Sequence, residues 1–285
     1  PLGKLLAVKP LGEITSQTTL SGSVGSAQSG GVVGLVDMNV DALSFAGYNY
    51  SSIGIEGRAS GSLYAADVRS DDSNMQFTLT ANADFEGVTP KYNIAINGLL
   101  ANLSAVGINK RDEVSQLSAD VVVDVKGRGL DDMDGKLSIT DAKYLYPDGE
   151  LTADNVTINI DDRQGLREMT LKSKYFDATY KSRANYKSVI GYMRSALKSY
   201  VPMLYDDTVE MLVDGGSVQV DDGYTLFTVV AHEDINHLLD AIYGGLLIAP
   251  NTEATMVLNP NSNYLSLQAS SEAVEFAGAL LADCN

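Results

Sequence analysis

The chain has 285 residues and a formal net charge of −17, and 45% of its residues are hydrophobic. It contains 26 glycines, six phenylalanines and no tryptophan, a composition typical of turn-rich β proteins. The acidic balance argues against nucleic acid as a partner, because non-specific binding needs a basic surface that displaces counterions. The single cysteine, Cys284, excludes an internal disulfide.

No run of residues approaches the roughly 18 apolar residues of a membrane-spanning helix. The chain also has no basic segment followed by an apolar one, as a signal peptide would have. Because the chain begins at Pro1 instead of methionine, we expect it to be an internal fragment of a longer protein. The missing targeting signals then say little about its location.

Residues from about 14 to 125 are predicted to be almost entirely strands. Val36, Met38 and Val40 alternate with polar neighbours, and segments 77–85 and 117–125 follow the same period of two. Successive side chains of a strand point to opposite faces, so each segment has one apolar and one polar face. One-sided strands of this kind favour an antiparallel sheet.

A strand with this pattern recurs at intervals of roughly 95 residues, at 75–85, 169–180 and 265–276, and such internal repetition predicts stacked units. Stacking would join their apolar faces into one strip. The expected organisation is a first β repeat over 1–112, a second over 113–205, and a third, degenerate repeat over 206–285.

Two segments follow the helical period instead. Apolar residues at spacings of three and four predict an amphipathic helix over 184–204, whose regular part ends near Pro202. A shorter helix is predicted over 234–243, with Asp234 as a candidate N-cap. The expected fold class is therefore all-β, a twisted antiparallel sheet with one or two short amphipathic helices.

Positive charge gathers between residues 172 and 198, where seven lysines and arginines accompany a single acid, Asp177. We interpret this stretch as a solvated face whose cations pair with nearby acids. Contact with anionic headgroups or with an acidic partner is the alternative.

No motif in the chain predicts catalysis. Ser195 and Lys198 match the S-x-x-K pattern of serine acyl-enzymes, but the companion motifs of those enzymes are missing. His232 and His237 lack the i, i+4 spacing of a metal-binding helix. The segment Asp131–Gly135 resembles the start of a calcium loop without its closing glutamate, so a turn is favoured. We expect no metal and no cofactor, and an enzyme such as a periplasmic hydrolase is the least favoured alternative.

Several segments resemble a known family. Gly127–Tyr146, Leu151–Ile160 and the strand that runs from Arg167 into Tyr180 are similar to the repeating module of the AsmA-like proteins, above all to the TamB-type proteins of the Bacteroidetes. The resemblance implies an elongated, highly twisted sheet that curls into an open half-pipe, or β-taco, with an apolar interior. It also implies a periplasmic location within a longer protein that is anchored in the inner membrane.

The resemblance further implies phospholipid transport toward the outer membrane. We therefore expect a non-enzymatic segment whose apolar groove shields lipid acyl chains from water. The residues expected to line this groove are Val36, Met38, Val40, Phe77, Leu79, Phe85, Val121, Val123, Val125, Leu137, Ile139, Val156, Ile158, Ile160, Met169, Leu171, Leu265 and Leu267.

Two other interpretations stay open. In the first, the chain is a scaffold for outer-membrane protein assembly, whose exposed sheet edges pair with client strands or with an assembly-factor barrel. In the second, the same strands close into a dry core, with Ile190, Leu197 and Leu204 of the long helix as its lid.

Overall fold

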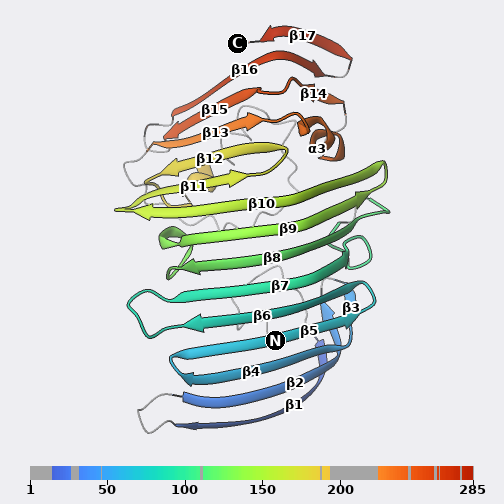
Figure 1. The fold of residues 1–285 in the computed structure, drawn as a ribbon, viewed down its shortest axis with the longest axis vertical. Coiled ribbons are helices and arrows are strands. Elements are labelled where there is room, and N and C mark those ends of the chain that lie inside the picture. The colour runs from blue at the N-terminus through green and yellow to red at the C-terminus, as the bar shows by residue number, and fades with distance from the viewer. Residues whose placement is uncertain are drawn as a thin grey trace. The chain divides into compact units, whose positions relative to one another are not determined.

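The computed structural model describes residues 15–26, 32–45, 47–109, 112–186, 188–192, 224–242, 245–259, 262, 264–276 and 278–284. Over these residues, 17 strands form one open sheet (Figure 1). The strand pairs whose register is known are all antiparallel. The prediction of an all-β, antiparallel fold with short helices is confirmed.

The chain divides into two compact units. Unit 1 consists of Pro1–Gly127 and Gly135–Thr157, and unit 2 consists of Arg128–Asp134 and Ile158–Asn285. The division into three repeats, 1–112, 113–205 and 206–285, is based on similarity between segments of the sequence and stays a prediction.

Unit 1 is a meander of long strands. Its described strands are β1 (Thr15–Ser26), β2 (Val32–Phe45), β3 (Tyr48–Tyr50), β4 (Ile53–Gly61), β5 (Leu63–Asp72), β6 (Met75–Asp84), β7 (Lys91–Asn102), β8 (Gln116–Lys126), nearly all of β9 (Asp134–Tyr146) and the first part of β10 (Gly149–Arg163). Consecutive strands pair, except that β4 pairs with β2 beyond the short β3.

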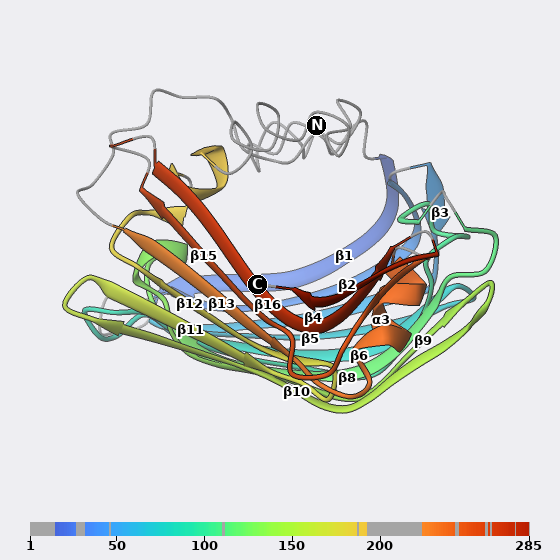
Figure 2. The same ribbon diagram turned by 90° about the horizontal axis from the view of Figure 1, so that it is seen from above.

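The sheet of unit 1 is curved, and bulges in its strands contribute to the curvature. The register between β7 and both of its neighbours shifts around Gly98, whose φ of 61° suits a residue without a Cβ. The Gly98 N–H donates to the Asp120 carboxylate at 2.6 Å. Because a bulge bends its strand and increases the local twist, it favours a concave sheet, and the strands of unit 1 curve in this way (Figure 2).

Unit 2 continues with shorter strands. They are the rest of β10, then β11 (Leu166–Lys172), β12 (Phe176–Ser182), β13 (Thr225–Ala231), β14 (Leu246–Ile248), β15 (Glu253–Asn259), β16 (Tyr264–Phe276) and β17 (Ala279–Cys284). Unit 2 also contains the 3₁₀ helix η2 (Leu130–Asp132) and the helix α3 (Ile235–Ile242).

The single strand predicted over 169–180 is wrong, because these residues form the hairpin of β11 and β12. Ser173 makes the turn. Its hydroxyl donates to the Phe176 carbonyl at 2.8 Å and accepts the N–H groups of Tyr175 and Phe176 at 3.2 and 3.1 Å. A serine that bonds to nearby backbone groups competes with strand pairing. The segments 75–84 and 264–276, by contrast, are the single strands β6 and β16.

Of the two predicted helices, the shorter one is confirmed, since α3 spans Ile235–Ile242 and was expected over 234–243. Within the longer prediction, residues 186 and 188–192 are helical. The rest of it, which includes Ser195, Leu197, Lys198 and Leu204, lies outside the described residues. Among the helices that the structure describes, none has the length and apolar character required to cross a membrane.

Candidate functional site

One face of unit 1 is apolar over six successive strand pairs. Residues directly opposite each other in antiparallel strands project from the same face. The register therefore joins three neighbouring rows across β1, β2 and β4 to β8. The first row contains Gly22, Val36, Gly57, Ala66, Ala81, Ile94 and Val123; the second contains Leu20, Met38, Ile55, Val68, Leu79, Ile96 and Val121; the third contains Val24, Gly34, Ala59, Tyr64, Ala83, Tyr92 and Val125.

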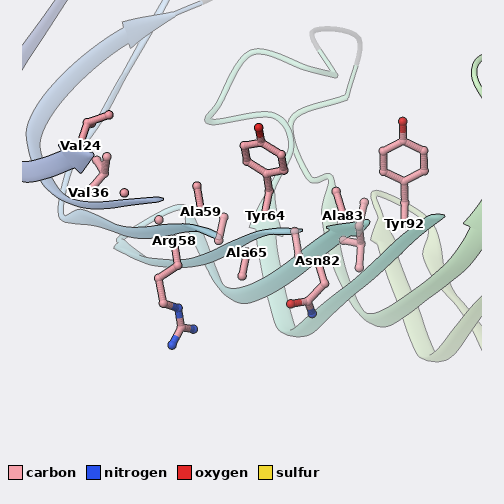
Figure 3. Close-up of a pocket in the computed structure, with 14 residues that line it drawn as sticks. Val24, Val36, Arg58, Ala59, Tyr64, Ala65, Asn82, Ala83 and Tyr92 are labelled. Atoms are coloured by element: carbon pink, nitrogen blue, oxygen red, sulfur yellow. The ribbon is translucent and has the colours of Figure 1, made fainter. Parts of the chain in front are cut away.

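The other face of the same strands is polar in its middle. Arg58 pairs with Asp67 across β4 and β5 at 2.5 Å, and the Thr80 hydroxyl donates to Asp67 at 3.1 Å. Figure 3 shows the two faces, with Tyr64 and Tyr92 projecting to one side and Arg58 to the other. Unit 1 is thus two-faced, with the rows above on what we call its apolar face.

The apolar face contains a hollow of about 440 Å³ between Val24 and Tyr92, shown in Figure 3. Its floor is made of small residues, including Gly57, Ala66 and Ala81, which leave space above the backbone. At one border, the ring of Phe85 meets the rings of Tyr64 and Tyr92 edge to face, with centroids 5.5 and 5.9 Å apart. Among the lining residues, Val24, Val36 and Tyr64 are exposed, so this face is open in the described part of the chain.

The rows are long enough for a lipid chain. Six steps between strands, at about 4.8 Å each, give a length of about 29 Å. The acyl layer of a single leaflet is about 15 Å deep, half of a bilayer core. The apolar face could therefore accommodate an extended acyl chain along its rows.

Along the strand direction, the apolar face ends at a buried carboxylate. Along β5, the apolar face runs from Tyr64 to Asp72, whose exposed fraction is only 1%. Asp72 accepts hydrogen bonds from the Tyr48 hydroxyl (2.8 Å), the Asn74 N–H (2.9 Å) and both the N–H and the hydroxyl of Ser51 (2.9 and 3.1 Å). These bonds tie β3 and the β5–β6 turn together. Burial alone would raise the pKa of Asp72, but the hydrogen bonds outweigh it and hold the pKa below its ordinary value.

This lowered pKa predicts a loss of stability in acid. A carboxyl with a depressed folded pKa contributes stability above its unfolded pKa, about 3.9, and loses it as the pH falls through the folded pKa. We expect Asp72→Asn to lower the unfolding midpoint at pH 7 and to matter progressively less below about pH 4. Denaturant unfolding of both proteins from pH 7 to pH 2 measures this. A gap between them that is independent of pH would contradict the assignment.

Unit 2 has an apolar face of its own, but a helical segment covers part of it. The register joins Met169, Tyr180, Phe227, Met256 and Leu267 in one row. Val189, which is 2% exposed, and Ala184 form a cluster with Tyr180 and Leu258, against which Met169, Tyr186, Tyr192, Phe227, Met256 and Leu265 pack. Leu267, at the end of the row, is 68% exposed.

An ionic network holds the start of this helical segment. Arg167 is buried and donates to the carbonyls of Arg183 (2.9 Å) and Ala184 (2.5 Å) and to the Asp131 carboxylate (3.2 Å). Asp131 Oδ1 also accepts the Tyr186 N–H at 2.8 Å. Asp131, considered from sequence as part of an incomplete calcium loop, thus belongs to a turn that anchors unit 2. Among the described residues, no group of three or more His, Cys, Asp or Glu side chains could hold a metal ion.

The structure distributes the expected groove residues over several places. It brings Val36, Met38, Val40, Phe77, Leu79, Val121, Val123 and Val125 onto the apolar face of unit 1, with Phe85 at its border. Leu137, Ile139, Val156, Ile158 and Ile160 are half-buried in β9 and β10. Met169, Leu171, Leu265 and Leu267 lie on the apolar face of unit 2.

The small floor residues Gly57, Ala66 and Ala81 were not predicted from sequence as part of the site, and neither were Tyr64 and Tyr92 at its aromatic border. The sequence contains a signal for them, because they occupy the same alternating positions as the larger apolar residues that were predicted to line the groove. Small residues matter here because they set the depth of the hollow.

Two of the four lysines and arginines that the structure describes in the basic stretch pair with nearby acids. Lys181 pairs with Glu168 at 2.8 Å and Lys174 with Asp234 at 3.8 Å. This agrees with a solvated face whose cations meet nearby acids. His232 lies 3.7 Å from Asp177, but its other ring nitrogen faces the Ser173 carbonyl, and the Ser173 hydroxyl bonds to Phe176. These three residues therefore lack the geometry of a nucleophile and its base.

Comparison with known proteins identifies no relative. No protein-family model, curated protein or solved structure matches the chain. Its function must therefore be inferred from its own residues.

Proposed function

We propose that this chain is a non-enzymatic, lipid-conducting segment whose apolar face in unit 1 shields phospholipid acyl chains from water. Its setting would be the periplasm, as part of a longer AsmA- or TamB-like protein that passes phospholipids toward the outer membrane. The observation that supports this proposal is the register of unit 1. It gathers three rows of apolar and small residues on one face, and several of their side chains, such as Leu20, Val24 and Val36, are exposed among the described residues.

The energetics favour an apolar ligand on this face. Several of its side chains, among them Val24, Val36 and Tyr64, are exposed. Removing such apolar surface from water lowers the free energy. Each buried methylene of the lipid contributes about 0.8 kcal/mol. Half of a sixteen-carbon chain would thus offset about 6 kcal/mol of aqueous exposure, without any chemical reaction.

The proposal is tested with a photocrosslinking amino acid at Val123, in the first row, and at its neighbour Asp124. Val123 lies opposite Ile94 on the apolar face, and Asp124 lies opposite Asn93 on the other face. We expect ultraviolet light to crosslink phospholipid to position 123 in cells, with at least tenfold less at position 124. Equal capture at both positions, or capture at 124 alone, would rule out the groove.

A scaffold for outer-membrane protein assembly is the second candidate. The observation in its favour is that the sheet is open, because an open sheet has edges whose backbone groups can pair with an extended client strand. Proline substitutions at an edge would then block assembly of the client and leave lipid capture at Val123 intact. The two functions thus differ in which substitution affects which readout.

A further inference from the structure

We infer that the helical segment over unit 2 is a displaceable plug, which occupies a second lipid site until an acyl chain replaces it. The plug segment is defined as residues 184–186 and 188–192. This inference rests on the proposed function, because it concerns how lipid gains access to the apolar face of unit 2.

The face beneath the plug segment has the chemistry of the open face in unit 1. Met169, Tyr180, Phe227 and Met256 form one row across four neighbouring strands, as the rows of unit 1 do. Over them lies Val189, and the ring of Tyr186 stacks on the ring of Tyr180 with centroids 5.4 Å apart. Tyr186 and Val189 thus cover apolar surface that an acyl chain would cover equally well.

The plug segment is held by polar contacts at its beginning. Tyr186 and Arg167 share the carboxylate of Asp131, whose side chain is 51% exposed. Water can therefore compete for that carboxylate. Gly191 lies within the helical turns, where glycine lowers the intrinsic stability of a helix. Both features make release of this segment easier than release of a regular core helix.

The interface under the plug segment is also incompletely satisfied. Among the described residues, Arg167 Nε and the Tyr180 hydroxyl are buried and find no hydrogen-bond partner. Buried donors without acceptors are unfavourable relative to hydrated ones, and native cores avoid them. When the plug segment leaves, both groups regain access to water or to the polar part of a lipid. Hydration of these two groups therefore favours release of the plug segment.

The test measures exposure of the plug segment directly. In a Cys284→Ser background, Val189→Cys places one thiol under the cover, and its rate of maleimide alkylation reports undocking. We expect monomeric dihexanoyl phosphatidylcholine to raise this rate at least tenfold. Asp131→Asn should raise the rate without lipid by a similar factor. The matched control is Asp132→Asn, because Asp132 accepts the N–H groups of Arg128 and Gly129, neither of which belongs to the plug segment.

The outcomes separate this inference from the proposed function. Suppose that lipid is captured at Val123 in unit 1 but that the alkylation rate of the Val189→Cys thiol does not change when lipid is added. The segment would then be a permanent part of the core, and the inference would fail while the proposed function stood. Absence of lipid capture at Val123 would refute the proposed function first. The lipid titration uses a chain with the native Asp131. It therefore tests whether lipid displaces the plug segment even if Asp131→Asn does not fold.

Discussion

Replacing Ala81 by aspartate is expected to reduce lipid capture on the apolar face of unit 1 by roughly 100-fold. Ala81 lies in the floor of the hollow, opposite Ala66 on one side and Ile94 on the other. Placing a carboxylate against hydrocarbon costs about 3 kcal/mol on insertion scales, and each 1.4 kcal/mol is a factor of about ten in occupancy. The crosslinking yield from position 123, which lies in the same row, measures the effect.

The matched control for this substitution is Thr80→Asp. Thr80 is the preceding residue of β6, but it stands opposite Asp67 and Ala95 on the other face of the strand. The same charge is thus added one residue away without entering the lipid path. The new carboxylate repels Asp67 and so lowers stability, but it stays outside the lipid path, so we expect capture per folded protein to stay within about twofold of the unmodified chain. Equal losses per folded protein for the two variants would refute a lipid path along the first row.

Gly135→Ala is expected to destabilise unit 1 by about 3 kcal/mol, as overpacking and a strained backbone together do. Gly135 is the second residue of β9 and has a φ of 144°, a conformation that favours glycine. An added Cβ would lie 2.2 Å from the Asp124 carbonyl oxygen and 2.7 Å from Val125 Cα. Since both are backbone atoms of the neighbouring strand, β8 and β9 would have to separate. Denaturant unfolding followed by circular dichroism measures the loss.

Gly129→Ala is the control for that experiment. Gly129 lies six residues earlier and an added Cβ would meet nothing within 4 Å. Its stability should change by less than about 0.5 kcal/mol. If both alanine variants unfold at the same denaturant concentration, close approach of β8 and β9 is not what requires glycine at position 135.

The alternation of apolar and polar residues predicted the fold class correctly because it is a local property. Val36, Met38 and Val40 share a face whatever strand lies beside them, since side chains two apart in a strand always do. The same reasoning applies to Val121, Val123 and Val125. It failed at 169–180, where alternation continued through a turn. The hydroxyl of Ser173 made that turn by bonding to nearby backbone groups, and nothing in the period of two signals this.

The candidate sites could be predicted only in part. Some of their large residues were predicted, because Leu79 or Val123 signals burial by its own chemistry, whereas others, such as Val68 and Tyr64, were not. The floor of the hollow was not predicted. Ala66 and Ala81 can be recognised as part of a floor only from the register, which places them opposite each other on neighbouring strands. The buried carboxylate of Asp72 was missed for a similar reason, since its donors Tyr48 and Ser51 lie more than 20 residues away in sequence.

Local patterns of residues were enough to predict one-sided antiparallel strands, helices after residue 184 and near residue 235, and large side chains that share a face. Which face is open and which is covered became clear from the folded structure alone. That choice depends on contacts between distant segments, such as Asp131 with Tyr186 and Val189 with Leu258. Alternation in the sequence indicates which side chains of a strand share a face, but packing between distant segments determines which residues, if any, cover that face.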